Sequence, residues 1–444
     1  MNRLFSTFTG GLAAIMIGSC TGETVDYTVP PVTPPTTPPE VEVAELPAEM
    51  PDVAPPTVAS APLSTISTET VDNFNDFSMR FYLANSEKSR ENVCVSPFSV
   101  GAVLGMIANG DDGEGRDEIL KVLGFDQSED GLNALNAYYQ TLMSNLPNIE
   151  EGISCDVTNT MWCDPLTFRI RKSFMQAIMD RYYAYGIGIN PGGAVGQKAI
   201  NEFVDKNTNG LIKNLLTSPL DISMAFLNTL YFKAGWSQGF DEFATSKRPF
   251  LDIDGKEKEA DFMYRFGMTE YVETEDGTEA VRLNYGNQRQ LSMTCILPSS
   301  RINHIPLDEA LTPDNIRSIN IGMKEENVMM WLPKFEIESK DTATIDILKH
   351  LGAEKVCSGQ YPFGLIAAQE KFCLNYFIHA TKIKVDENGT EGAAVSLGGM
   401  DNAVGPGFEE TSIREIIFDR PFIFYIQENT TGAILFIGSV KTFS

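Results

Sequence analysis

The sequence predicts one large α+β domain that follows an unfolded N-terminal region. The chain has 444 residues and is 43% hydrophobic, which is ordinary for a globular protein. Helical and strand patterns are mixed from about residue 66 to the C-terminus, with no evident internal repeat. Because nothing like a linker interrupts that stretch, we expect a single domain over residues 66–444.

Three stretches near the start of this domain predict helices. Residues 72–83 carry apolar side chains at helical spacing behind Asp72, a candidate N-cap. Residues 100–108 are apolar almost all round, which is typical of a buried helix. A third helix is expected to begin near Asp117, after a Gly-rich turn.

Four later stretches predict strands because they are rich in β-branched or aromatic residues. Two of them are residues 225–233 and 290–297. The other two, residues 418–427 and 433–440, are joined by a turn-like segment that ends at Gly432.

The charge of the chain excludes several classes of partner. Its 34 Lys and Arg residues face 60 Asp and Glu residues, a formal net charge of -26 at pH 7. Such a surface repels phosphate backbones and sulfated sugars, so we expect no nucleic-acid partner and see no heparin site. Solubility is the simplest explanation of the acidity.

The N-terminus has the pattern of an export signal. Arg3 precedes a short apolar run, residues 10–18, which is too short to span a bilayer. The run ends in Ile-Gly-Ser-Cys at Cys20, which resembles a bacterial lipobox. This resemblance implies that residues 1–20 form a lipoprotein signal peptide with a lipidated Cys20, and that the protein is exported and held at the bacterial outer membrane or cell surface. A plain signal peptide with a chance Cys is the alternative.

Residues 21–65 are predicted to be a disordered linker. Residues 28–62 contain 11 of the 24 prolines of the chain, and such sequence favours extended polyproline II over a packed core. We interpret the region as a stalk, with a docking motif for another domain as the alternative.

No motif in the sequence indicates catalysis or a bound metal. G-x-S-x-G, H-E-x-x-H and C-x-x-C are absent, and the acidic residues 109–117 lack the ligand spacing of a calcium loop. We therefore expect no catalytic residue, metal or cofactor, and a binder or inhibitor is favoured over a hydrolase or a sugar-binding lipoprotein. The six cysteines other than Cys20 are assigned to no disulfide.

Several ordered motifs together resemble the serpins, the serine protease inhibitor superfamily. They are NVCVSPFS at residues 92–99, FVDKNTNGLIKNLL at 203–216, LNTLYFKAGWSQGFDEF at 227–243 (with Ala234 where the family usually has Gly), WLPKF at 331–335, His379 ahead of VDENGTE at 385–391, and RPF at 420–422. One such match would be weak, but these are spread in order over nearly all of residues 66–444.

The resemblance implies a fold and a mechanism. The fold would be a single domain with three β-sheets, about nine helices and an exposed reactive-centre loop. The protein would be a monomeric suicide-substrate inhibitor of serine endopeptidases. After cleavage, the loop would insert as a new strand into the central sheet and trap the acylated protease.

The residues of the loop fit that mechanism. The hinge implied by the resemblance comprises Glu387, Gly389, Thr390, Glu391, Gly392, Ala393, Ala394 and Ser396. From Thr390 onward every second residue shares one strand face, and through Asn402 none of these is charged. Glu391 and Asp401 fall on the other face. A charge on the inward face would cost several kcal/mol of desolvation.

The family's spacing from Glu387 puts the reactive bond between Ala403 and Val404. A small Ala before that bond suits elastase-like proteases. The segment between Gly389 and Pro421 is longer than in the family, so Met400 and Val404 remain alternative recognition residues. No Lys or Arg occurs in residues 389–413, which argues against trypsin-like targets.

The resemblance also assigns residues that control opening of the sheet. These are Ser96, Ser99, Asn228 and His379 in a polar cluster beneath the sheet, and Trp236 where the loop enters. A satisfied core histidine is the alternative for His379. For the whole protein, a non-inhibitory binding serpin and a cross-class inhibitor of cysteine proteases remain alternatives.

Overall fold

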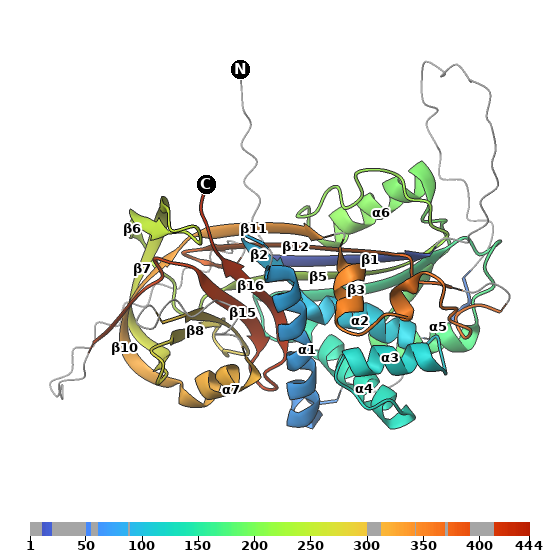
Figure 1. Ribbon diagram of the computed structural model, residues 1–444, viewed down its shortest axis with the longest axis horizontal. Helices are drawn as coiled ribbons and strands as arrows, with labels where there is room; N and C mark the ends of the chain where they lie inside the picture. The colour runs from blue at the N-terminus through green and yellow to red at the C-terminus, as the bar shows by residue number, and fades with distance from the viewer. Residues whose placement is uncertain are drawn as a thin grey trace, which may run out of the picture.

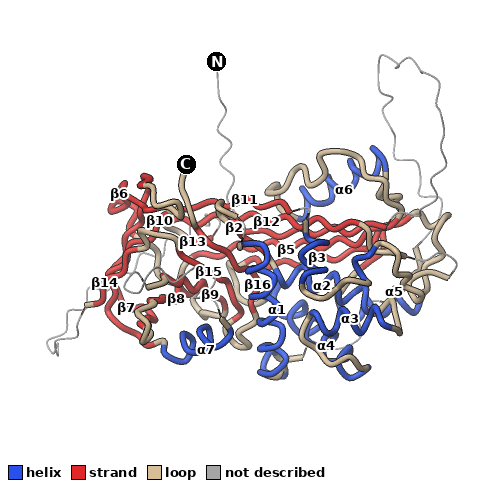
Figure 2. The backbone as a smooth tube through the Cα atoms, in the orientation of Figure 1, coloured by secondary structure: helices blue, strands red, loops and turns tan. Residues whose placement is uncertain are grey.

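Two hydrogen-bonded β-sheets and eight α-helices make up the described part of the chain (Figures 1 and 2). The structure is a computed structural model that describes residues 11–19, 50–54, 61–87, 89–299, 312–341, 343–368, 372–390 and 413–444. This arrangement confirms the predicted α+β class.

Ser67 is the N-cap of the first helix. The helices are α1 (Thr68–Ser86), α2 (Pro97–Ala108), α3 (Glu114–Val122), α4 (Glu129–Asn145), α5 (Lys172–Tyr182), α6 (Gly193–Asn207), α7 (Pro313–Gly322) and α8 (Thr344–His350). The Ser67 side chain accepts a hydrogen bond of 3.2 Å from the Thr70 backbone N–H. The predicted cap at Asp72 is therefore wrong, because Asp72 already lies inside α1.

The first sheet has its long strands at the centre. Its strands are β1 (Gly11–Ser19), β3 (Ser154–Cys163), β4 (Tyr185–Ile187), β5 (Met224–Gly235), β11 (Phe335–Asp341), β12 (Tyr376–Asp386) and β13 (Gly389–Thr390). The strand β5 pairs with β3 on one side, and with β1 and β13 on the other. Both β1 and β13 pair in turn with β12, whose far edge pairs with β11.

The second sheet is made of two parts that share the long strand β7. Its strands are β2 (Val93–Val95), β6 (Asp241–Leu251), β7 (Glu257–Glu273), β8 (Glu279–Tyr285), β9 (Leu291–Leu297), β10 (Lys324–Pro333), β14 (Arg414–Ile417), β15 (Phe422–Glu428) and β16 (Ile434–Val440). One part joins β6, β7, β10 and β14, and the other runs from β7 through β8, β9, β15 and β16 to β2. With the first sheet, they form the three sheets that the sequence resemblance implied.

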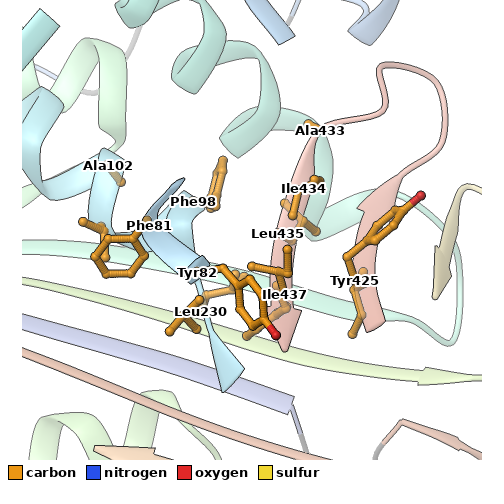
Figure 3. Close-up of a cluster of buried hydrophobic side chains, with 14 of the residues drawn as sticks. Phe81, Tyr82, Phe98, Ala102, Leu230, Tyr425, Ala433, Ile434, Leu435 and Ile437 are labelled. Carbon is orange, nitrogen blue, oxygen red and sulfur yellow. The ribbon is translucent and has the colours of Figure 1, made fainter. Parts of the chain in front are cut away.

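The main core lies where α2 packs between the first sheet and β16. Every residue of α2 is buried, as its apolar sequence predicts. Figure 3 shows Phe98 and Ala102 of α2 among side chains of α1, β5, β15 and β16. A Cβ at Gly101 would lie 2.3 Å from Tyr139 Oη, so this helix needs glycine to approach the aromatic residues of α4 so closely. A smaller core lies between α6 and the opposite face of the first sheet (Figure 1).

Two described pieces of the predicted linker contact the folded body. Ala54 donates its backbone N–H to Gln176 Oε1 at 3.1 Å. The Ala61 carbonyl accepts a hydrogen bond of 2.9 Å from Asn145 Nδ2. Contacts with the body therefore begin before residue 66. A membrane-spanning helix would need more length and apolarity than any helix in the described residues has.

Candidate functional site

The candidate site is a strand position between β5 and β12, which we call the insertion slot. At one end of the slot, Gly389 and Thr390 of β13 pair with Gly235 and Ala234 of β5. The same two residues pair with β12 on the other side. The start of the predicted loop hinge thus already lies inside the first sheet.

Thr390 faces the main core. Its side chain is fully buried, and Thr390 Oγ1 lies 2.6 Å from Tyr285 Oη, within hydrogen-bond distance. Tyr285 stacks on Trp236 with ring centroids 4.5 Å apart. Because successive residues of a strand alternate faces, even-numbered residues that continued this strand would also face the core.

Trp236 fixes the backbone at the entrance of the slot. Its indole Nε1 donates to the Asp386 carbonyl at 2.9 Å, and its backbone N–H donates to the Asn388 carbonyl at 3.0 Å. Trp236 thus lies beside the turn that precedes Gly389 and Thr390. These contacts hold the turn between β12 and β13 against the end of β5.

Glu387 anchors the same turn through an ion pair. Lys334 Nζ lies 3.0 Å from Glu387 Oε2, and Thr245 Oγ1 donates to Glu387 Oε1 at 2.7 Å. Burial opposes ionisation of this carboxyl, but the hydrogen bonds from Thr245 and Lys334 outweigh burial and lower its pKa. The hinge therefore begins at a charged, fixed residue.

The polar cluster lies halfway along the slot, at the N-terminus of α2. Ser96 is the N-cap of α2, and its backbone N–H donates to His379 Nε2 at 3.0 Å. Ser96 Oγ donates to the Leu435 carbonyl at 2.9 Å and lies 3.1 Å from Ser99 Oγ. Three of the residues assigned to sheet opening are therefore in contact.

Asn228, the fourth residue assigned to sheet opening, lies on the other side of the slot, on β5. Its Nδ2 donates to Asn159 Oδ1 at 2.8 Å, and Asn159 Nδ2 donates to the Tyr182 carbonyl at 2.8 Å. These bonds tie β5 to β3 and to the end of α5. Asn228 and His379 lie in the same row of the sheet, one on each side of the slot.

His379 is held neutral by its surroundings. Burial lowers the pKa of this imidazole from 6.5 to about 3. Nε2 must be unprotonated because it accepts the hydrogen bond from Ser96. A protonated ring would lose that bond and place a charge in the core.

The remaining predicted site residues lie outside the described residues. They are Cys20, Glu391, Gly392, Ala393, Ala394, Ser396, Met400, Ala403 and Val404. The sequence reasoning missed Asn159, Tyr285, Thr245 and Lys334 as partners of the site. Lys334 stands within the motif WLPKF and was accessible to sequence reasoning. Asn159 and Tyr285 reach the site only through long-range pairing, which left no signal in the sequence.

Two of the described cysteines, Cys94 and Cys357, carry buried thiols. Burial raises the pKa of the Cys94 and Cys357 thiols to about 12, so they are poor nucleophiles at neutral pH. Within the described ranges, no cluster of three or more His, Cys, Asp or Glu side chains is arranged to hold a metal ion.

Comparison with known proteins identifies the family. A family profile described as "Serpin (serine protease inhibitor)" matches residues 72–442. Serpin-ZX of Arabidopsis thaliana is 32% identical over 391 residues, covering 84% of this chain and 98% of the plant protein. Iripin-3 of Ixodes ricinus is 28% identical over 382 residues, covering 83% and 93% of the two chains.

Solved structures agree with this result. The native state of the thermophilic serpin tengpin is similar, with a TM-score of 0.72, 27% identity, and coverage of 87% of this chain and 100% of tengpin. Thyroxine-binding globulin in complex with thyroxine has a TM-score of 0.73 at 20% identity, covers 85% and 99% of the two chains, and shows likeness of fold alone.

The chain belongs to the serpin family. Serpins are generally protease inhibitors rather than enzymes.

We predict that His379→Gln reduces the loss of folding stability that the protein undergoes at acidic pH. Since the folded pKa of His379 lies below the unfolded value, its contribution to stability is complete above pH 6.5 and is lost as pH falls toward 3. The free energy of unfolding of the wild type should therefore fall relative to His379→Gln by about 2 kcal/mol between pH 7 and pH 5. Urea unfolding at both pH values measures this, with the exposed His350→Gln as control. If the free energy of unfolding changed with pH by the same amount in the wild type and in His379→Gln, buried His379 would not be the neutral group that we infer.

We also predict that Gly389→Ala weakens the entrance of the slot. Gly389 has φ +153°, and a Cβ there would lie 2.2 Å from the Ala234 carbonyl oxygen. The substitution should lower the free energy of unfolding by about 1–3 kcal/mol more than Gly255→Ala does. Gly255 is the matched control because it also has a positive φ but open space around it. Equal decreases in the free energy of unfolding of the two variants would show that the close approach of the Ala234 carbonyl to Gly389 does not affect stability.

Proposed function

We propose that this serpin is a suicide-substrate inhibitor of serine endopeptidases, with elastase-like enzymes as the favoured targets. A protease would cleave the loop at Ala403–Val404, with Met400 or Val404 as alternative recognition residues. The cut loop would then enter the insertion slot while the protease is still acylated. No cofactor takes part in this mechanism.

The main support is that the first sheet accommodates a strand between β5 and β12. Nine residues, Gly11–Ser19, occupy this position as β1 and pair with both neighbours. Thr390 lies in the same strand position at the other end, with its side chain toward the core. Residues that continue from Thr390 would find a ladder of backbone partners on both sides.

The sequence of the loop suits the two environments that such a strand meets. Residues 392, 394, 396, 398 and 400 are Gly, Ala, Ser, Gly and Met, and they would face the main core. Glu391 would lie opposite Lys233, on the face that α6 partly covers. The charged residue would thereby be kept out of the core, where burial of a charge costs several kcal/mol.

Insertion would be strongly favourable once the loop is cut. About ten new backbone hydrogen bonds at roughly 0.5–1.5 kcal/mol each rival a whole-domain stability of about 5–15 kcal/mol. The glycines of the segment reduce this by about 0.5–1 kcal/mol each. The balance supplies the driving force needed to carry the bound protease and distort it.

We also propose that the protein acts outside the cell, on a lipid anchor. The support is the lipobox-like sequence ending at Cys20 and the Pro-rich stretch after it. The anchor would hold a monomeric inhibitor at the bacterial surface, where it meets foreign proteases.

Thr390→Arg should convert the inhibitor into a substrate. An Arg at this fully buried position would place a charge against Tyr285 and hold the start of the loop out of the slot, so that insertion could not continue from Thr390. The test incubates the exported protein with elastase and looks for an SDS-stable complex on a gel. The wild type should form the complex, whereas Thr390→Arg should be cleaved without forming it.

Thr430→Arg, in the exposed turn between β15 and β16, controls for the added charge and should behave as the wild type. Mass spectrometry of the cleaved chain identifies the reactive bond. An undiminished complex from Thr390→Arg would refute the mechanism, and no complex from the wild type with any serine protease of a panel would refute the function.

A further inference from the structure

The strand β1 fills the insertion slot over most of its length. Residues 11–19 pair antiparallel with residues 232–224 of β5, and residues 12–18 pair antiparallel with residues 382–376 of β12 (Figure 1). Because β13 is also antiparallel to both strands, β1 and β13 run in the same direction and lie end to end.

The register shows that β1 and an inserted loop would need the same positions. Thr390 pairs with Ala234, so continuation of the strand brings Gly392 opposite Phe232, where Gly11 already lies. On the other side, Ala393 would reach Lys382, where Leu12 lies. The overlap between β1 and an inserted loop covers nine rows of the sheet. In the last of these rows, Ser19 now lies opposite Met224, and Met400 would lie there after insertion. Two strands cannot pair with the same backbone groups, so occupation by one excludes the other.

We propose that residues 11–19 are an internal competitor that holds the insertion slot closed to the loop as long as they remain attached to the body. This inference rests on the proposed function and adds a regulatory step to it. A chain that keeps residues 11–19 would be cut by a protease as a substrate, and a chain that lacks them would trap the protease.

One row of the slot suits the loop better than it suits β1. Ile15 lies between Asn228 and His379, whose Oδ1 and Nδ1 atoms are buried and have no hydrogen-bond partner in the described part of the chain. In the sequence, residue 15 is an isoleucine, a residue type without a side-chain polar atom. Continued in the same register, the strand would bring Ser396 to this row after insertion. The hydroxyl of a serine can donate to the side-chain amide oxygen Oδ1 of Asn228 and accept from the Nδ1–H of His379. The competitor is therefore the poorer occupant and is replaceable once it can leave.

The position of the predicted cleavage site gives the competitor a means of release. Hydrolysis of the Ser19–Cys20 peptide bond consumes one water molecule and leaves a carboxylate on Ser19 and an amine on Cys20. This cut falls at the end of β1, so it would separate the whole competitor from the body. Removal of the export signal would then also start inhibitory activity, and an unprocessed chain inside the cell would trap no protease.

The experiment uses the full chain produced without export, so that residues 1–19 are retained. Three proteins are compared: the wild type, Ala14→Pro in the middle of β1, and Val25→Pro as a matched control outside β1. Proline removes a backbone donor and is poorly tolerated in a central strand, so Ala14→Pro should release the competitor without altering the body. The readouts are amide hydrogen exchange of residues 11–19 and the yield of SDS-stable elastase complex per cleaved chain.

In the wild type, amides of residues 11–19 should exchange at least about 100-fold more slowly than in an unstructured peptide. Ala14→Pro should lose this protection. Its yield of complex per cleaved chain should be at least about five times that of the wild type, as expected from the loss of one or more hydrogen bonds between β1 and its neighbours. Val25→Pro should match the wild type in both readouts.

Unprotected amides at residues 11–19 in the wild type would overturn the inference. Equal yields of complex from the wild type and Ala14→Pro would also overturn it, provided that the exported chain forms the complex. If no form of the chain yields a complex although residues 11–19 are protected, the proposed function fails, while the occupation of the slot by β1 is supported.

Discussion

The structure depends on the two strand edges that β5 and β12 present to each other across one strand position, which β13 and β1 fill. Each edge offers a row of backbone donors and acceptors, and burial without partners would cost each of these groups about 1–3 kcal/mol. A strand between them satisfies both edges at once. At one end Gly389 and Thr390 fill this position, and further along residues 11–19 fill it. Any segment that takes this position gains two ladders of hydrogen bonds, which is the energy source that the proposed inhibitor would use.

The surroundings of the slot define where a strand enters and what it meets. The entrance is rigid because Trp236, Tyr285 and the Glu387–Lys334 ion pair fix the turn before Thr390. Halfway along, a neutral His379 and the N-cap of α2 form a buried polar row. Desolvation makes this row intolerant of charge but receptive to a small hydroxyl. These two regions would suit the sequence that follows Glu387, in which every second residue from Thr390 to Asn402 is uncharged.

Much of the fold was predictable from the sequence because its patterns are local. The helix at residues 100–108 and the strands around 225–233 and 433–440 follow from apolar content and β-branched residues, and the structure has them as α2, β5 and β16. The cap at Asp72 was wrong because Ser67, five residues earlier, satisfies the first turn of α1. Contacts such as Tyr285 with Thr390 join segments about 100 residues apart and leave no periodic signal. The apolar run before Cys20 predicts an export signal, and only the pairing with β5 and β12 shows that it also fits a strand position.

The most direct test of the account is the unfolding temperature of the exported protein before and after one cut in the loop between Leu397 and Val404. If the cut segment becomes a strand of the first sheet, about ten ladder hydrogen bonds of roughly 1 kcal/mol each should raise the midpoint by more than about 10 °C. Calorimetry of the intact and cut forms, at the same pH and concentration, gives this difference. An unchanged or lower midpoint after the cut would contradict the claim that the sheet takes up the loop.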